Sequence, residues 1–378
     1  MRILLLNYEY PPLGGGGGVA AKQLARGFLE LGYEVDYVTT WFEGLNDDET
    51  EKGLNIHKIK VIGRKDLSTA TMQSLISFPF FAYRKCVKLC KKNQYKFINT
   101  HFAVPTGPLG VVLSKIFKIP NILSIHGGDI YDPSKSNSPH NKWYFQKTVS
   151  WVLNQSDYIV AQSLNTKMNT EKYYSFNKDI SIISLPYEKK IFTKISRKEL
   201  KLDDSSVYII SVGRLIKRKG YDFLIRSVAK TNNKNIVSLI IGDGPEKEYL
   251  QQLADSLSIR RQVIFLGFVS EERKMQYLAV SDLYVLSSIH EGFGIVLLEA
   301  MQAGIPIVST DIGGQVDLIR DGVNGHLIKF GDETKLAAIL DDLSSDKSAD
   351  KQMLIDNKKM LAEFNFRKIS KKYIDIVK

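Results

Sequence analysis

The sequence is poor in cysteine and has no long apolar run. Only two of its 378 residues are cysteines, Cys86 and Cys90; thiols four positions apart on a predicted helix are better interpreted as reduced than as a disulfide or metal site. No stretch approaches the roughly 18 apolar residues of a membrane span. The short apolar start, Met1–Leu6, precedes polar residues and prolines, which indicates a first strand and not a signal peptide. We therefore expect an intracellular, cytoplasmic protein.

Short repeats and low-complexity tracts are also absent, apart from the glycine run 14–18. A composition of 44% hydrophobic and 25% charged residues excludes an intrinsically disordered chain. A chain of this length is too long for one ordinary core and suits two domains of about 180 residues each.

Acidic residues are outnumbered by basic ones, mostly in the first half. The net charge is +11, and residues 1–190 hold 24 Lys/Arg against 16 Asp/Glu. The segment Phe78–Lys96 fits a helix on an anionic membrane surface, and it fits a solvated helix face about equally well. No recognition module accompanies the charge, so we expect no nucleic-acid partner. The acid-free part of the segment contains the basic residues Arg84, Lys85, Lys88, Lys91, Lys92 and Lys96.

Apolar, β-branched runs alternate with helical segments throughout, which predicts parallel sheets covered by helices on both faces. The predicted strands are 2–7, 33–40, 55–61, 96–101, 120–126 and 157–162 in the first half, and 206–212, 236–242, 262–266, 282–287, 305–310 and 325–329 in the second. This α/β pattern predicts two doubly wound, Rossmann-like domains, residues 1–185 and 205–359, joined by a linker at 186–204. Ligands of such sheets bind beyond the carboxyl ends of the strands.

A glycine run follows the first strand. Gly14, Gly15, Gly16 and Gly17, with a helix expected from about Val19, allow close backbone approach to a phosphate or a sugar.

The same run also matches a dinucleotide fingerprint at Gly15, Gly17 and Ala20, with Asp36 as the ribose-binding acid. That alternative is disfavoured because the fingerprint glycines should follow the strand directly, and because Asp36 lies inside its own strand.

A histidine ends another predicted strand. His126 precedes two glycines and Asp129, which places its side chain well for a hydrogen bond to a substrate hydroxyl. A structural capping role is the alternative. For His101, at the end of an earlier strand, we expect an architectural role.

A basic turn opens the second domain. We expect Arg214 and Lys219 to point toward a diphosphate at the start of a helix near Tyr221, while Lys217 and Arg218 are solvated. A basic turn without a ligand is the alternative. Further along the chain, the backbone at Phe268 ends a strand where it can reach a base edge.

The stretch His290–Glu299 changes from a polar loop to an apolar helix that starts near Gly294 and stops at Gly304. Glu291 is then in the loop at the helix N-terminus, and Glu299 is about one turn into the helix. A carboxylate among apolar residues needs donors, which either a ligand or a basic partner in the core supplies. The paired glycines after Asp311 are expected to line the same site.

Four motifs occur in a fixed order: the glycine-rich loop, His-Gly-Gly-Asp from His126, Gly-Arg-x5-Gly from Gly213, and Glu-x7-Glu from Glu291. In this order they resemble the retaining glycosyltransferases of family 4 across essentially the whole chain. The resemblance implies the GT-B architecture, two Rossmann-like domains facing across a cleft, with a C-terminal helix, within 360–378, crossing back to the first domain.

The resemblance also implies roles for these residues. Glu299 would hold the donor ribose, Arg214 and Lys219 the diphosphate, and Glu291 and His126 would contact the sugar. Backbone groups of the helix start would add donors, and the glycine loop would approach the diphosphate and the acceptor. The residues that would add backbone donors are Gly292, Phe293, Gly294 and Ile295. Those that would approach the diphosphate and the acceptor are Gly14, Gly15, Gly16, Gly17 and Asp129.

The expected reaction is a retaining transfer of a hexose from a nucleoside-diphosphate sugar, UDP favoured and GDP possible, to a lipid-linked or envelope glycan at the cytoplasmic membrane face. No Asp-x-Asp pair is present, so no metal or other cofactor is expected. A nucleotide-sugar epimerase of GT-B fold is the alternative enzyme, and a catalytically silent nucleotide-binding partner is the alternative without activity.

Two segments depart from the family pattern. Leu185–Glu188 replaces the usual Asn-Gly-Val-Asp-like turn, and Val316-Asp317 replaces the usual Pro-Glu. The contacts of these two segments with substrates are therefore left open.

Overall fold

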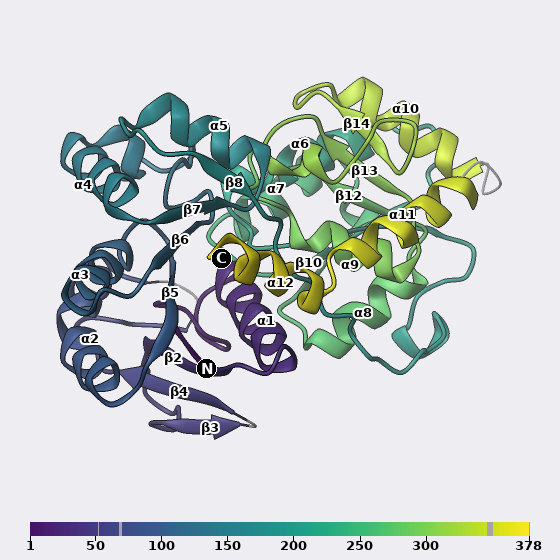
Figure 1. Cartoon of the computed structure of the whole chain (residues 1–378). Coiled ribbons are helices and arrows are strands. Elements are labelled where there is room, and N and C mark those ends of the chain that lie inside the picture. The colour runs from purple at the N-terminus through teal and green to yellow at the C-terminus, as the bar shows by residue number, and fades with distance from the viewer. Residues whose placement is uncertain (52, 68–69, 346–350, 378) are drawn as a thin grey trace. The chain divides into compact units, whose positions relative to one another are not determined.

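The computed structural model describes residues 1–51, 53–67, 70–345 and 351–377. The chain forms two compact units, one of Met1–Glu188 with Glu363–Lys378 and the other of Lys189–Ala362. Each unit is built on a sheet of mainly parallel strands covered by helices (Figure 1). Residues 346–350 and 378, which belong to the predicted ranges 205–359 and 360–378, lie outside the described residues.

The first sheet has the strand order β3-β4-β2-β1-β5-β6-β7-β8, in which only the edge pair β3–β4 is antiparallel. All six predicted strands of this half are present. The two additional strands, β3 and β8, have three residues each and carry no apolar run that would have predicted them. The bounds are β1 Arg2–Leu6, β2 Glu34–Thr40, β3 Glu49–Glu51, β4 Leu54–Ile59, β5 Tyr95–His101, β6 Asn121–Ile125, β7 Tyr158–Ala161 and β8 Ile180–Ile182.

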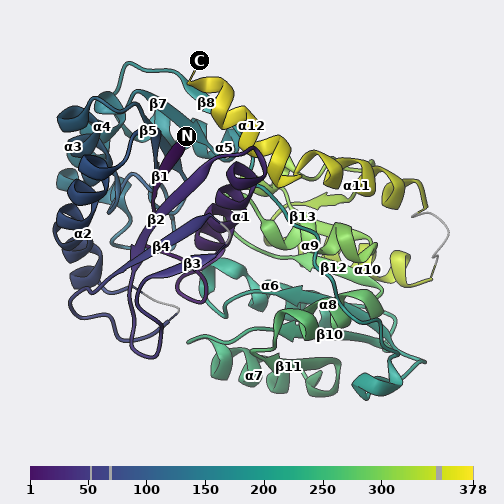
Figure 2. The same ribbon diagram turned by 60° about the horizontal axis from the view of Figure 1, so that its bottom comes forward.

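Helices cover both faces of this sheet, because β1 and β5 feed crossovers that run in opposite directions along it. Alternate residues of β1 enter separate cores: Ile3 and Leu5 pack with α1 and α12, while Leu4 and Leu6 pack with α2 and α3. Figures 1 and 2 show α2, α3 and α4 together on one face. The helices are α1 Gly16–Glu30, α2 Met72–Lys92, α3 Gly107–Phe117, α4 Trp143–Gln155, α5 Leu164–Tyr173 and α12 Phe366–Ile376.

The C-terminal segment returns to the first unit as the resemblance implied. From the helical pattern we also expect one helix from about residue 358 to the end of the chain, but the structure divides this segment into two helices. α11, Lys351–Glu363, ends before Asn365, whose side chain caps α12 by accepting hydrogen bonds from the backbone N–H groups of Arg367 and Lys368. Ser370 then donates to the carbonyl of Leu24 on α1 at 3.0 Å. The cap explains the break, because Asn favours the non-helical N-cap conformation.

The second sheet is parallel throughout, in the order β11-β10-β9-β12-β13-β14. The strand order reverses between β9 and β12, so the loops that follow these two strands meet at the carboxyl edge of the sheet. All six predicted strands of this half are present. The elements are β9 Val207–Val212, β10 Ile236–Ile241, β11 Val263–Gly267, β12 Leu283–Leu286, β13 Ile307–Thr310 and β14 His326–Ile328, with α6 Tyr221–Ala229, α7 Lys247–Ser256, α8 Glu271–Val280, α9 Ile295–Ala303 and α10 Glu333–Ser345.

The segment 189–205, most of the predicted linker, packs against the second unit. Arg197 forms an ion pair with Asp282 at 2.6 Å and donates to the carbonyl of Val280 at 3.0 Å. Cys86 and Cys90 are buried free thiols, as expected. Among the described residues, none of the helices combines the length and apolar composition needed to span a bilayer.

Candidate functional site

The loops after β9 and β12 are joined by a buried cluster of charges. One carboxylate oxygen of Glu291 lies 2.6 Å from Lys219 Nζ and accepts from Ser288 Oγ at 2.7 Å. The other lies 3.7 Å from Arg218 Nη1. Burial alone would raise the pKa of the Glu291 carboxyl, but Lys219 and Arg218 outweigh burial and lower that pKa to about 2. Glu291 is therefore held as a charged, oriented carboxylate.

Two basic side chains of this turn differ from the prediction. Arg218, expected to be solvated, is partly buried and donates to the carbonyl of His290 at 2.7 Å. Arg214, expected to point inward, is exposed, as is Lys217. Arg218 and Lys219 both belong to the 3₁₀ turn Lys217–Lys219 and both contact the Glu291 loop, whereas Arg214 lies before this turn.

Glu299 is 4% exposed and has one engaged and one unengaged carboxylate oxygen. Its Oε1 lies 2.8 Å from Lys274 Nζ, while Oε2 has no hydrogen-bond partner within the described part of the chain. Burial raises the pKa of Glu299, and Lys274 offsets only part of that effect. The core ion pair with a basic side chain is therefore present, and Oε2 is a buried acceptor that the pair leaves unused; the ligand role of Glu299 stays a prediction.

The start of α9 is shaped by glycine. Gly294 has φ 98°, a left-handed conformation that favours glycine, and α9 begins at the next residue, as predicted. The loop after β13 packs against this turn, as expected: Gly314 N–H donates to the carbonyl of Glu291 at 2.7 Å, and a Cβ on Gly314 would lie 2.1 Å from the carbonyl oxygen of Gly292. Phe293 is buried, while Phe268 is 90% exposed at the end of β11.

In the first unit, His126 and Asp129 form one buried turn after β6. Asp129 accepts from the backbone N–H of His126 at 2.9 Å and from that of Ala103 at 2.6 Å, and burial raises its pKa to about 6. The amide of Gln162 donates to the carbonyl of His126. The His126 ring lies against the His101 ring, with 2.8 Å between Nε2 of His126 and Nδ1 of His101. His101 is thus a neighbour of the candidate site.

The glycine loop differs from the prediction in two ways. α1 begins at Gly16, three residues earlier than predicted, so glycines form its first turn. The carboxylate of Glu9 accepts from the backbone N–H groups of Gly15 at 3.1 Å and Gly18 at 3.2 Å, and burial raises its pKa. Part of the donor set expected for a ligand is therefore used by Glu9.

Gly17 makes room for an aromatic ring. A Cβ there would lie 2.5 Å from Cζ of Phe102, whose ring packs on His126 with 4.4 Å between centroids. Among the described residues, nothing lies within 4 Å of a Cβ built on Gly15. The Cβ side of Gly15 is therefore open within the described part of the chain, although its N–H is bonded to Glu9, whereas Gly17 serves packing.

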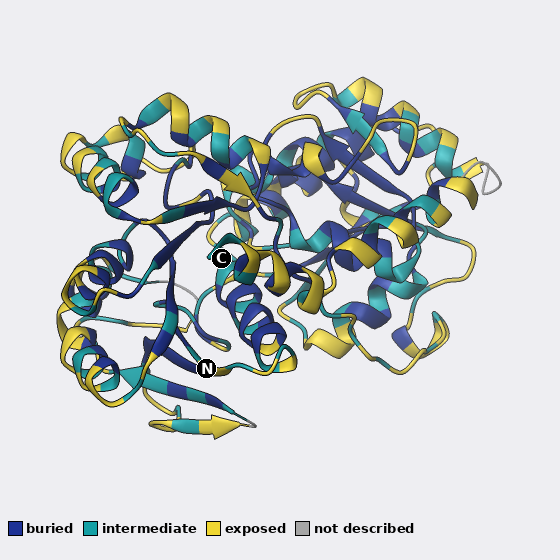
Figure 3. Cartoon of the chain, viewed as in Figure 1, coloured by how far each residue is buried: buried dark blue, intermediate teal, exposed yellow. Residues whose placement is uncertain are grey.

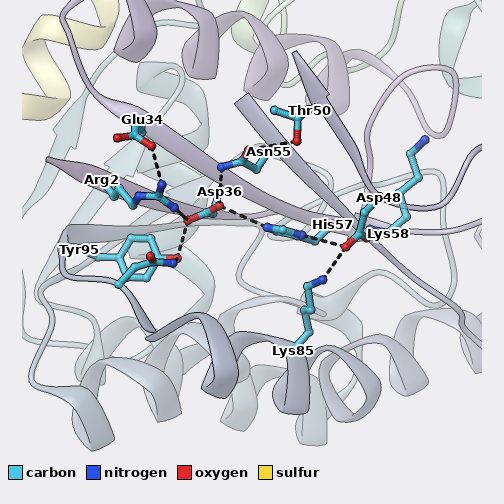
Figure 4. A network of polar contacts seen from close by, with 11 residues as sticks. Arg2, Glu34, Asp36, Asp48, Thr50, Asn55, His57, Lys58, Lys85 and Tyr95 are labelled. Atoms are coloured by element: carbon cyan, nitrogen blue, oxygen red, sulfur yellow. Dashed lines mark hydrogen bonds and ion pairs between the residues drawn. The ribbon is translucent and has the colours of Figure 1, made fainter. Parts of the chain in front are cut away.

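Asp36 has no room for a cofactor ribose, so the dinucleotide alternative is wrong. Its carboxylate accepts from Tyr95 Oη at 2.6 Å and Asn55 Nδ2 at 2.9 Å, and it lies 3.2 Å from both Arg2 Nη1 and His57 Nε2 (Figure 4). Burial would raise the pKa of Asp36, but the hydrogen bonds, led by that of His57, lower it to about 2. Asp36 is a structural anion that ties together β1, β2, β4 and β5.

Sequence reasoning missed several residues that contact the predicted ones, among them Ser288, Glu9, Lys274 and Arg218. Ser288, three positions before Glu291, and Glu9, six before Gly15, are close enough in sequence that polar residues beside a site could have indicated them. Lys274 lies 25 positions from Glu299 on another helix, and Arg218 was assigned to solvent. No local pattern predicts either contact.

Comparisons with known proteins show the family of the chain. The family model "Glycosyltransferase Family 4" matches residues 14–188, and the model "Glycosyl transferases group 1" matches residues 192–360. An uncharacterized glycosyltransferase of Methanocaldococcus jannaschii is 30% identical over 397 aligned positions, which cover 100% of this chain and 98% of that protein. The chain belongs to glycosyltransferase family 4. The N-acetyl-alpha-D-glucosaminyl L-malate synthase of Bacillus anthracis is 28% identical to this glycosyltransferase, and the alignment covers 87% of this chain and 84% of that protein.

Solved structures show the same GT-B fold. Sucrose-phosphate synthase from Thermosynechococcus elongatus has a TM-score of 0.86 at 19% identity, covering 99% of this glycosyltransferase and 98% of that chain. The Anabaena protein HepE, in complex with UDP and glucose, has a TM-score of 0.79 at 20% identity, covering 100% and 99%. The family matches make the chain a group 1 glycosyltransferase, and nothing among the comparisons supports the epimerase alternative.

Proposed function

We propose that this glycosyltransferase moves a hexose from a UDP-sugar to a lipid-linked or envelope glycan, with retention of anomeric configuration and without a metal ion. The observation that carries the donor assignment is the buried, unengaged Oε2 of Glu299, in the same unit as the Lys219–Glu291 cluster. A carboxylate oxygen buried in this way is suited to a ribose hydroxyl, which is a neutral donor.

Lys219 and Arg218 are the proposed diphosphate ligands, with Arg214 at the exposed edge of the turn. The Lys219 ammonium has three donors, of which Glu291 uses one, so the others can reach a phosphate. As the nucleoside diphosphate leaves, its growing negative charge is stabilised by these cations and by the N-terminus of α9. In a front-face transfer, the donor phosphate accepts the proton of the attacking hydroxyl.

Glu291 orients the sugar in this proposal and is not a nucleophile. Its carboxylate is occupied by Lys219 and Ser288, which lowers its basicity and fixes its direction. Within the described residues, no group of three His, Cys, Asp or Glu is arranged to hold a metal ion. The metal-independent reaction stays a prediction.

A donor screen tests the proposal. The structure of the Anabaena neighbour with UDP-glucose supports UDP as the nucleotide of the donor. UDP-sugars should raise the melting temperature, because a ligand that binds only the folded state stabilises it, while ADP- and GDP-sugars should have smaller effects. The screen is followed by product analysis with and without a glycan acceptor. Conversion of the donor sugar without an acceptor, or no response to any nucleotide sugar, would contradict the proposed transfer.

The face of α2, α3 and α4 supports peripheral docking on the anionic inner surface of a membrane. On α2, Phe80 and Phe81 are exposed, followed by the exposed cations Arg84 and Lys88. Figure 3 shows many exposed positions, in yellow, on the helices that Figure 1 labels α2, α3 and α4. α4 adds exposed aromatic side chains that suit the interface between water and lipid. These side chains are Trp143, Tyr144 and Trp151.

A further inference from the structure

His126 contains a buried ring nitrogen without a partner. The residue is 8% exposed, and its Nδ1 makes no hydrogen bond within the described ranges. A neutral imidazole has one nitrogen that donates and one that accepts. The tautomer of His126 therefore decides which kind of ligand group Nδ1 can bind.

The hydrogen bonds of the Asn99 side-chain amide fix its orientation, and this orientation determines which nitrogen of His101 carries the proton. Its Nδ2 donates to Ser124 Oγ at 2.9 Å and to the backbone carbonyl of Ile122 at 3.3 Å. A carbonyl can only accept, so the nitrogen must face Ile122 and the amide oxygen must face His101. Asn99 Oδ1 lies 2.9 Å from His101 Nε2, and that ring nitrogen must therefore carry a proton.

The tautomer of His101 then determines that of His126. Burial lowers the pKa of His101 well below its ordinary value and that of His126 to about 4, so both rings are neutral at neutral pH. With Nε2 protonated, His101 Nδ1 has a lone pair, and it lies 2.8 Å from His126 Nε2. His126 Nε2 must donate there, because the other tautomer would place two lone pairs against each other.

We propose that Asn99 and His101 are positioning residues that hold His126 with an unprotonated Nδ1, so that this nitrogen accepts a hydrogen bond from a hydroxyl of the bound sugar. The hydroxyl assignment rests on the proposed function, whereas the tautomer rests on the hydrogen-bond geometry of two buried, neutral rings. Asp129 and Gln162 fix the backbone on both sides of the ring, and Phe102 packs on its face. In this state His126 selects a hydroxyl-bearing substrate and does not supply a proton to the leaving group.

Nitrogen NMR of the full chain without a ligand tests the tautomer. In long-range proton–nitrogen spectra, His126 Nδ1 should have the shift of an unprotonated ring nitrogen and Nε2 that of a protonated one. His101→Asn keeps an acceptor near the position of Nδ1 and should preserve this pattern. His101→Leu, similar in size, removes the acceptor and should give a mixture. A protonated Nδ1 in the wild-type protein overturns the proposal, whether or not either variant folds.

The direction of the substrate hydrogen bond is tested with UDP-glucose analogues that lack one hydroxyl or carry fluorine in its place. At the position that faces His126, both analogues should bind roughly 2- to 10-fold more weakly, since fluorine cannot donate and the loss is that of one hydrogen bond. His126→Phe should remove the difference. Full recovery with fluorine would overturn the proposal. Failure to bind any UDP-sugar would contradict the proposed function, and the tautomer would still be decided by the spectra.

Discussion

Three buried carboxylates differ in the number of donors that surround them. Asp36 is surrounded by Arg2, Asn55, His57 and Tyr95, and its pKa is lowered to about 2; that of Glu291, beside two cations and Ser288, is also about 2. The pKa of Glu299, with Lys274 on one oxygen only, is raised. A carboxylate without its full set of donors gains most from a ligand hydroxyl, which distinguishes Glu299 from Asp36.

Asp36 should make the stability of the first unit sensitive to acid. A carboxyl whose folded pKa is depressed stabilises the fold above its unfolded pKa of about 3.9 and loses that contribution as pH falls toward about 2. Asp36→Asn should lower the free energy of unfolding at pH 7 by about 2 kcal/mol and flatten its decline between about pH 4 and 2.

Urea unfolding at a series of pH values measures this effect. Glu34→Gln is the matched control, because Glu34 also pairs with Arg2 but has a side chain that is 54% exposed. If the free energy of unfolding of Asp36→Asn declines in acid as steeply as that of the wild-type protein, groups other than Asp36 determine the decline.

At the scale of elements, the glycines of the glycine loop and of the start of α1 have two different roles, packing at Gly17 and ligand access at Gly15. Gly17→Ala forces a Cβ against Phe102 and should cost roughly 1–3 kcal/mol, the usual cost of overpacking. Gly15→Ala, whose Cβ would meet no atom of the described residues and whose φ is −130°, should leave the melting temperature unchanged and raise KM if a ligand approaches that backbone. Thermal melting and donor kinetics on the pair check both statements. A destabilised Gly15→Ala, or a fully stable Gly17→Ala, would contradict the assignment.

The exposed face of α2 should bind anionic vesicles. Lys88, Lys91 and Lys92 are exposed, and each basic residue near such a surface contributes about 1 kcal/mol, so changing all three to Glu should weaken binding on the order of 100-fold. Lys85→Gln is the control, because Lys85 is already paired with Asp48 at 2.5 Å. Flotation with vesicles containing phosphatidylserine measures the effect. Equal flotation of the triple variant and the wild-type protein would exclude this docking surface.

For the whole molecule, hydrophobic patterning predicted the fold well. Twelve predicted strands are present, because buried parallel strands produce continuous apolar runs. β3 and β8 were missed because edge strands of three residues need no such run. The break between α11 and α12 depends on one capping side chain, Asn365, inside a segment that otherwise has a helical pattern.

The site was predicted less completely than the fold. Spacing placed Glu291 and Glu299 correctly on loop and helix, because helix start and stop signals are local. The inward turn of Arg218 and the pairing of Lys274 with Glu299 depend on contacts between separate elements, which one sequence does not encode locally. The positions of His101 and Asn99 beside His126 follow from the pairing of β5 with β6, and their spacing alone gave no sign of it.

The most direct test of the account is calorimetric binding of UDP and of its 2′,3′-dideoxy analogue to the wild-type protein and to Glu299→Ala. Loss of hydrogen bonds to a charged group should weaken wild-type binding of the analogue about 10- to 100-fold. Glu299→Ala should bind both ligands equally, while Glu271→Ala, which removes an exposed carboxylate that pairs with Lys274 and Lys190, should behave as wild type. If Glu299→Ala still distinguishes the two ligands as strongly as the wild-type protein, the ribose is bound elsewhere and the donor site proposed for this glycosyltransferase is wrong.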